Sequence, residues 1–272
     1  MVFMKLLTLN THSWLEVHQI PKLYALAKEI LQENVDVVVL QEVNQFPATP
    51  RDEHPLGLKE SFGRKIHHDN FARLLVLALC QLGDPQISWT WAWLGTHRGF
   101  DRYDEGVAVL SRIGMIECRE LDHGGDYPWT DHRRRRSLAA HIAGRWILSS
   151  HFSWWPAFRE EWGQLKPQLE DLRAQAPVII AGDFNNPANR DGEGYSLVLN
   201  DGWRDSFRCA HYTEGECTVH RVIDGWENVA DNLRIDFVFI SDDLSVSSYQ
   251  VVFQDNTDEA VSDHSGIVVE IP

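Results

Sequence analysis

Polar residues with catalytic potential stand at, or directly after, the ends of short apolar segments of this chain. A side chain at a strand end is held by a rigid scaffold and still faces a shared cleft, the usual placement of sites in α/β proteins. Carboxylates bind hard cations, and imidazoles titrate near neutral pH. The sequence therefore predicts one convergent site, built from Asn10, Glu42, His151, Asp183, Asn185, Asp236 and His264.

The segments that position these residues alternate between apolar strands and amphipathic helices. Residues 35–40 and 177–181 are short apolar runs, many of them β-branched, which is typical of strands buried on both faces. Residues 20–33, 70–82 and 157–174 carry the pattern of amphipathic helices. Further strands are predicted at the chain start and at 89–94, 106–111, 137–142, 145–150, 234–240, 246–253 and 266–271, with a hairpin at Ala143-Gly144.

So many strands with few covering helices indicate a mixed-sheet α/β sandwich, because both faces of a sheet must be protected from water. The chain has 272 residues, of which 43% are hydrophobic, enough for one substantial core. We therefore expect a single domain over residues 1–272, although length alone also allows two smaller ones. No segment has the length and composition of an interdomain linker.

The net charge, the lengths of the apolar runs and the cysteines indicate which binding partners and which cellular compartment suit this chain. The formal net charge is −15, with 40 acidic and 25 basic residues, and such a field repels a long polyanion unless a local basic groove overrides it. Nucleic acid is therefore disfavoured, although an acidic surplus also serves solubility alone. No apolar run approaches the roughly 20 residues of a membrane span, and no signal peptide is evident. Four widely spaced cysteines without a C-x-x-C pair fit a reducing, cytoplasmic setting.

Seven short segments occur in an order that resembles the endonuclease/exonuclease/phosphatase superfamily. The most specific is Gly-Asp183-Phe-Asn185, and the set runs from residue 4 to 264. The resemblance implies a divalent-metal-dependent phosphoesterase and a four-layer α/β sandwich, with two mixed β-sheets packed face to face and helices outside. The other segments are Leu-Thr-Leu-Asn10, Leu-Gln-Glu42, Glu105-Gly-Val-Ala-Val-Leu-Ser, Ser-Ser-His151-Phe, Arg-Ile-Asp236-Phe-Val and Ser-Asp263-His264.

By that resemblance, Glu42 binds a Mg²⁺ or Mn²⁺ ion, and Asn10 positions the ion or the phosphate. Mg²⁺ typically takes one or two carboxylates and keeps waters and substrate oxygens. Taken alone, Glu42 also fits a solvated strand end, and Asn10 is more typical of a turn. Asp263 is either a metal ligand or a helper of the following loop. His12 stands where the abasic-site endonucleases carry an acidic residue, which puts a nuclease-type second metal contact in doubt.

The same resemblance assigns the catalytic groups. Asp183 and Asn185 correspond to the pair that orients the attacking water and binds phosphate, and His264 acts at the scissile phosphate. Asp236 is its expected partner, because a carboxylate decides the tautomer and basicity of an imidazole.

A second active-site histidine is also implied. His151 follows the predicted strand 145–150, and Glu105 is expected to be its carboxylate partner, a pairing of the deoxyribonuclease branch. A histidine in isolation is more commonly a buried structural residue. The position after a strand is therefore what favours a role in the site.

Two groups of residues are candidates for binding substrate. Arg133–Arg136 are four consecutive arginines that enter a predicted strand, and alternation would aim two of them toward each face. Arg134 and Arg136 are the candidates to fix a phosphomonoester, because guanidinium forks match phosphate geometry, although a solvated basic patch explains the run equally well. Trp154 and Trp155 offer flat apolar rings that suit a sugar, whereas most of the 11 tryptophans are expected in the core.

A closer resemblance narrows the substrate. Lys-Leu-Leu-Thr-Leu-Asn10-Thr-His-Ser-Trp14, Leu-Gln-Glu42-Val-Asn-Gln, Asp69-Asn-Phe-Ala and Tyr103-Asp-Glu-Gly are similar to the bacterial maltose 6'-phosphate phosphatase branch. This implies a cytoplasmic phosphatase whose partner is a small-molecule phosphate ester, a disaccharide phosphate that yields free sugar and orthophosphate. The oligomeric state is left open.

Three alternatives remain at this point. A nuclease would share the whole catalytic set but would need a basic groove. A secreted sphingomyelinase-like phosphodiesterase would need a signal peptide. A non-catalytic binding scaffold would be expected to have lost at least one site residue, and the set is intact.

Overall fold

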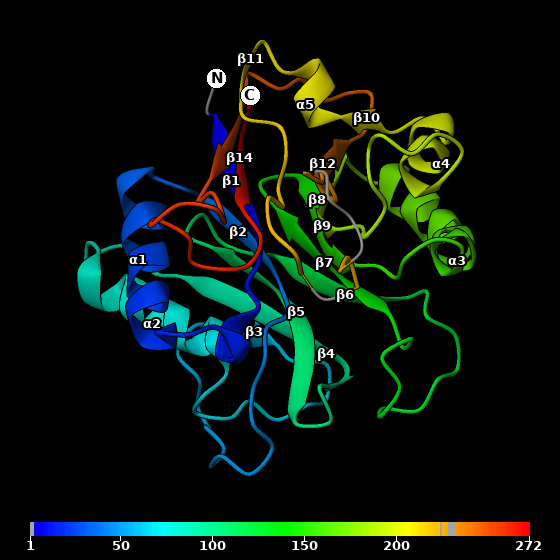
Figure 1. The fold of residues 1–272 in the computed structure, drawn as a ribbon. Coiled ribbons are helices and arrows are strands. Elements are labelled where there is room, and N and C mark those ends of the chain that lie inside the picture. The colour runs from blue at the N-terminus through cyan, green and yellow to red at the C-terminus, as the bar shows by residue number, and fades with distance from the viewer. Residues whose placement is uncertain (1–2, 224, 228–231) are drawn as a thin grey trace.

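The computed structural model describes residues 3–223, 225–227 and 232–272. Two mixed β-sheets, one of eight strands and one of six, pack against each other (Figure 1). Helices cover their outer faces, α1 and α2 on one side and α3 and α4 on the other (Figure 1). The predicted four-layer α/β sandwich is confirmed. Across the described ranges, no helix combines the length and apolar character needed to span a bilayer.

The eight-stranded sheet has the order β11-β13-β14-β1-β2-β5-β4-β3. Its central pair, β1 and β2, is parallel and is connected through α1, which is the predicted β-α-β unit. A short 3-10 helix, Ser13–Leu15, follows β1. The elements are β1 (Met4–Asn10), α1 (Gln19–Gln32), β2 (Val37–Gln41), β3 (Leu58–Glu60), α2 (Phe71–Leu82), β4 (Thr90–Gly99), β5 (Tyr103–Ser111), β11 (Tyr212–Glu214), β13 (Ser248–Val252) and β14 (Gly266–Ile271).

The six-stranded sheet has the order β10-β12-β9-β8-β7-β6. β8 and β9 are parallel and are joined by α3, while the other neighbours are antiparallel. The elements are β6 (Glu117–Asp122), β7 (Arg136–Ile142), β8 (Arg145–His151), α3 (Ala157–Arg173), β9 (Val178–Asp183), α4 (Gly194–Asn200), β10 (Arg204–Asp205), α5 (Ser206–Cys209) and β12 (Asp236–Ile240).

Three apolar layers hold these sheets and helices together. The middle layer lies between the sheets and includes Val39 and Val109 from one sheet and Leu138 and Ile179 from the other. The outer layers pack α1 and α2, and α3 and α4, onto the remaining faces. Strands in the centre of such a stack are covered on both faces, which explains why their sequences are continuous apolar runs rather than alternating ones.

Local signals define several element boundaries. The side chain of Asn70 caps α2 by accepting a hydrogen bond of 3.1 Å from the backbone N–H of Arg73. Ala143 and Gly144 both have positive φ, 48° and 75°, as a two-residue hairpin turn between β7 and β8 requires. The edge strand β6 was not predicted, because four of its six residues carry charged side chains and lack apolar alternation.

Gly182 provides a test of how closely β8 and β9 approach beside the site. Its φ is 145°, and a Cβ there would lie 1.9 Å from the carbonyl oxygen of Ser150. We expect Gly182→Ala to lower the free energy of unfolding by about 3 kcal/mol or more, because backbone strain and overpacking add. Gly163→Ala is the matched control, since its Cβ would point into open space on α3 and should stabilise by about 0.5–1 kcal/mol. Equal urea midpoints for both variants would contradict this account.

Candidate active site

Three polar residues lie side by side across neighbouring strands of the six-stranded sheet. His151 ends β8, Asp183 ends β9, and Asp236 begins β12. The register pairs His151 with Asp183, and Asp183 with Asp236. Because β12 runs antiparallel to β9, its first residue lies at the same edge of the sheet as the last residue of β9. The strand ends thus bring together residues that are far apart in sequence.

His264 reaches this edge from the loop that precedes β14. Its Nδ1 lies 2.9 Å from Asp236 Oδ2, the predicted contact, and its Nε2 lies 3.9 Å from Asp183 Oδ2. Burial alone would lower the pKa of His264, but the charge and hydrogen bond of Asp236 and the charge of Asp183 raise it well above its usual value. The imidazolium is therefore favoured at neutral pH, with Nδ1 donating to Asp236 and Nε2 directed toward Asp183.

Asn185 connects Asp183 to His151. Its backbone N–H donates to Asp183 Oδ1 at 2.9 Å, and its side-chain amide donates to the Phe152 carbonyl at 3.0 Å. The amide nitrogen also lies 3.3 Å from His151 Nε2. Burial, followed by the charge of Arg135, holds the pKa of His151 well below its usual value. His151 is therefore neutral, and its Nε2 accepts the Asn185 amide hydrogen.

Asn10 joins the two sheets at the site. It ends β1, and its amide nitrogen donates to Glu42 Oε1 at 2.9 Å and to Asp183 Oδ2 at 3.1 Å. Glu42 follows β2 directly and has a φ of 51°. The backbone carbonyl of Asn10 accepts a hydrogen bond of 2.7 Å from Ser262 Oγ, which ties the loop of His264 to the same strand end. Asn10 thus orients two carboxylates that belong to different sheets.

The negative charge of the carboxylates in this site is only partly balanced by positive charge and hydrogen bonds from the protein. Burial, then the charge of Asp263, raises the pKa of Glu42, and burial with the charge of Asp236 raises the pKa of Asp183 to about 7. Glu42 Oε2 and Asp236 Oδ1 are buried and have no hydrogen-bond partner among the described residues. The unpartnered Glu42 oxygen suits a hard divalent cation, which would supply positive charge there. Asp183, Asp236 and His264 form a separate buried group whose ligand atoms lie within 4.8 Å of one another, and this group could also hold a cation.

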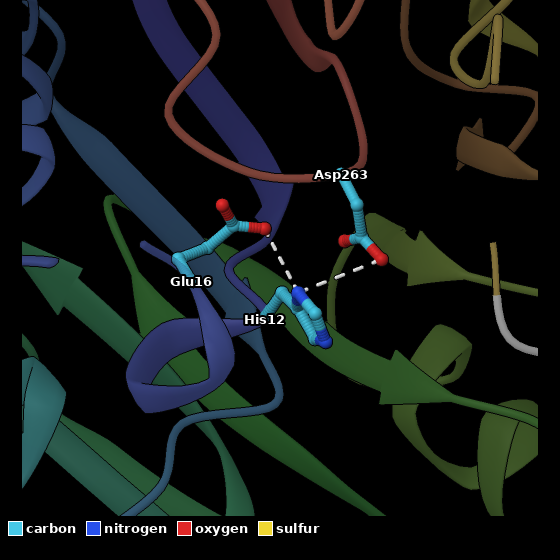
Figure 2. Close-up of side chains that lie close together, drawn as sticks. All are labelled: His12, Glu16 and Asp263. Atoms are coloured by element: carbon cyan, nitrogen blue, oxygen red, sulfur yellow. Dashed lines mark hydrogen bonds and ion pairs between the residues drawn. The ribbon is translucent and has the colours of Figure 1, made fainter. Parts of the chain in front are cut away.

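His12, Glu16 and Asp263 form a second cluster of close side chains (Figure 2). His12 Nδ1 lies 2.8 Å from Glu16 Oε1 and 3.6 Å from Asp263 Oδ2. Burial would lower the pKa of His12, but the hydrogen bond of Glu16 and the charge of Asp263 outweigh it and raise the pKa to about 9. Asp263 therefore lies beside His12 and immediately before His264.

The expected pairing of Glu105 with His151 is wrong. Glu105 Oε1 instead lies 3.3 Å from the Nε2 of His97, which is directly opposite in the β4–β5 register. Gly99 leaves room for this carboxylate, since a Cβ there would lie 2.2 Å from Glu105 Oε2. Burial and the charge of Glu42 raise the pKa of Glu105 to about 8. Sequence reasoning missed His97 because it ended the strand at Leu94, whereas β4 continues to Gly99.

The expectation that Arg134 and Arg136 face the site is also wrong. Arg134 donates to the Thr96 carbonyl and lies over Trp129, and Arg136 pairs with Glu120 and Asp122 of β6. Arg135 lines the pocket instead. Two physical reasons account for this. Strand β7 begins only at Arg136, so the alternation rule does not extend to the residues before it, and the unpredicted strand β6 supplies acidic partners.

The site contains a cavity of about 260 Å³, which Asn10 and Asp236 support without lining it. Trp154 lies in its wall as expected, whereas Trp155 lines a neighbouring cavity. Sequence reasoning did not identify the apolar residues Phe100 and Ile223, which come from loops without a motif. The lining residues with chemically active side chains are His12, Glu42, His97, Glu105, His132, Arg135, His151, Asp183, Asn185, Asp263 and His264.

Comparisons with known proteins show which sequences and folds this chain resembles. A sequence model described as "Endonuclease/Exonuclease/phosphatase family" matches residues 21–264. A family protein from Leptotrichia buccalis is 29% identical, with a TM-score of 0.86 and 99% of each chain covered. A search of curated proteins found no match.

Two more distant solved structures share the fold alone. A mannosyl-6-phosphatase from Bacteroides thetaiotaomicron is 17% identical, with a TM-score of 0.67 and 99% of each chain covered. TDP2 from D. rerio, solved with a single-strand DNA product, is 16% identical, with a TM-score of 0.64 and 99% of each chain covered. The same architecture thus carries a sugar phosphatase in one protein and a DNA-binding site in another.

The raised pKa values predict how the metal-free protein responds to pH. Asp183, Glu105 and His12 have pKa values of about 7, 8 and 9, all above their unfolded values, and the pKa of His264 is also raised. Between the ordinary pKa of each group, 3.8 for Asp183, 4.5 for Glu105 and 6.5 for His12, and its raised value, the folded state holds more protons than the unfolded state, so stability falls as pH rises from about 4 to about 9. A divalent cation replaces those protons, and we expect Mg²⁺ or Mn²⁺ to raise Tm more at pH 8.5 than at pH 6.

Thermal unfolding of the metal-free and metal-saturated protein measures this effect. Glu42→Gln should reduce the metal-induced rise in Tm, and the exposed Glu170→Gln should not. A rise in Tm that is the same at both pH values, or in both variants, would show that no cation binds at the buried carboxylates.

Proposed function

Because this chain belongs to the endonuclease/exonuclease/phosphatase family, we propose that it is a divalent-metal-dependent phosphatase that hydrolyses a sugar phosphate such as maltose 6'-phosphate. The family supports the phosphoesterase class, and the preference for a sugar phosphomonoester is our proposal. The observation that carries it is that the site is a small cavity with a buried arginine, Arg135, in its wall. Such a cavity suits a small-molecule ester better than a duplex.

Arg135 is placed to bind the phosphate of a monoester. Its side chain is 4% exposed, and its Nε donates to Ser153 Oγ at 3.3 Å. Ser153 is held in turn by Glu161, whose Oε2 accepts the Ser153 backbone N–H at 2.9 Å. Among the described residues, the two terminal nitrogens of Arg135 have no hydrogen-bond partner, so they are available to two phosphate oxygens. A guanidinium fork held in this way favours the dianion of a monoester over the single charge of a diester.

The proposed mechanism assigns a task to each central residue. Asp183, with a pKa near 7, orients the attacking water with Asn185 and takes up its proton. The water oxygen forms the new bond to phosphorus as the bond to the sugar oxygen breaks, and the sugar oxygen takes up a proton from solvent. His264, charged and held by Asp236, stabilises the phosphoryl oxygens. When bound at Glu42, the divalent ion neutralises further charge on the phosphoryl group.

A substrate panel tests the proposed function. Phosphate release is measured from mono- and disaccharide phosphates and nucleotides, phosphocholine release from sphingomyelin, and nicking of plasmid DNA, each with and without EDTA. We expect sugar phosphates to react fastest and EDTA to abolish the reaction. His264→Ala should lower the rate by roughly 10²–10⁴-fold, which ties the activity to this site, while the exposed His54→Ala should not change it. Plasmid nicking faster than phosphosugar hydrolysis would favour a nuclease instead.

The arginine run offers a matched pair of variants. We expect Arg135→Gln to lower kcat/KM for p-nitrophenyl phosphate by about 10–100-fold, the loss of a charge-assisted hydrogen-bond pair, and to affect bis(p-nitrophenyl) phosphate less. Arg134→Gln removes the same charge one residue away, where the side chain contacts Thr96 and Trp129, and should change either rate less than about two-fold. Equal losses in both variants would rule out a specific phosphate contact by Arg135.

A further inference from the structure

A second cavity of about 260 Å³ adjoins the catalytic one. Trp154 and Asn185 line both, so the two spaces share a wall and lie within reach of one ligand. The mechanism above uses only the first cavity and leaves the second without a role. Besides Asn185, the second cavity is lined by Trp154, Trp155, Arg190, Glu193 and the consecutive residues Gly225, Trp226 and Glu227.

The aromatic side chains of this second cavity are held in place by specific contacts. Gly225 has a φ of 82°, and a Cβ there would lie 2.5 Å from Trp154 Cζ2, so the chain closes directly onto the Trp154 indole. Trp226 Nε1 donates to Asn185 Oδ1 at 3.2 Å, which fixes its ring and couples it to an active-site amide. Trp154 remains 36% exposed, so part of its surface is free to meet a ligand. The second cavity is therefore an ordered aromatic surface directly beside the phosphate-binding residues.

The charged groups of the second cavity define which ligand it suits. Arg190 lies 5.2 Å from the Trp226 ring centre and 3.9 Å from Glu193, and Glu227 Oε1 accepts the Gly225 N–H at 3.0 Å. The two carboxylates can accept hydrogen bonds and the guanidinium can donate them, beside the indole faces of the second cavity. A sugar ring meets this pattern, because its C–H groups carry slight positive charge that suits the negative face of an indole, and its hydroxyls bond to carboxylates. A nucleic acid strand is disfavoured, since two carboxylates against one arginine repel its phosphates.

We propose that the second cavity is a leaving-group subsite that binds a further pyranose ring of the substrate, beyond the sugar that carries the phosphate. This inference rests on the proposed sugar phosphatase function. It assigns the enzyme's preference for a substrate with two sugar rings to Glu193, Glu227 and the tryptophan side chains of the second cavity. Phosphate bound beside Asn185 and His264 leaves the adjoining sugar at Trp154, and the next ring then reaches the second cavity. Specificity for a two-ring substrate therefore originates outside the catalytic residues.

Kinetics on two substrates test this assignment. The ratio of kcat/KM for maltose 6'-phosphate to that for glucose 6-phosphate is measured in the wild type and in Glu193→Ala, Glu227→Ala and the double variant. We expect the wild type to prefer the two-ring substrate and the double variant to lose about ten-fold of that preference. Glu170→Ala, an exposed carboxylate on α3, is the matched control and should keep the wild-type ratio. An unchanged ratio in the double variant would overturn the subsite.

Binding of unphosphorylated sugar gives an independent readout. Calorimetric titration with maltose and with glucose should show tighter binding of maltose to the wild type, and a loss of that difference in the double variant and in Trp155→Leu. Equal binding of both sugars to the wild type would also overturn the proposal. If no sugar phosphate is hydrolysed, the proposed function fails on its own. Hydrolysis of both sugar phosphates with no preference for two rings leaves the function standing and removes only the subsite.

Discussion

The side chain of Asn10 donates hydrogen bonds to two carboxylates on different sheets, 2.9 Å to Glu42 Oε1 and 3.1 Å to Asp183 Oδ2. The rest of the site depends on this bridge, because each sheet alone positions only part of the chemistry. Glu42 belongs to the eight-stranded sheet, whereas Asp183, Asp236 and His151 belong to the six-stranded one. The apolar layer between the sheets sets their separation, and the amide of Asn10 closes the remaining gap.

Burial then determines the chemical state of the groups that the bridge assembles. Removal from water raises the pKa of Glu42, Asp183 and Glu105, so the site holds acidic groups that are neutralised by protons or by a cation. The same burial keeps His151 neutral, whereas two carboxylates keep His264 charged. Two imidazoles in one pocket therefore have opposite preferences, and each suits a different task.

The proposed substrate preference depends on the surroundings of the cavity more than on its central residues. A mannosyl-6-phosphatase and TDP2, which was solved with single-strand DNA, share this fold, so the fold alone does not distinguish a sugar from a nucleic acid. The buried Arg135 and the indoles around Trp154 line the two cavities of an acidic protein with a net charge of −15. These features favour a compact, uncharged leaving group attached to a doubly charged phosphate.

The sequence by itself determined the layers, the strands and helices that build them, and the polar residues at the strand ends, because burial on both faces and segment order leave direct local patterns. Pairings between side chains were decided only by the tertiary structure. Glu105 lies opposite His97 because β4 extends past Leu94. Arg135 lies directly before the first residue of β7, Arg136, so strand alternation does not decide which way it points. Register, strand length and the unpredicted edge strand β6 set these contacts, and they arise from neighbours that are distant in the chain.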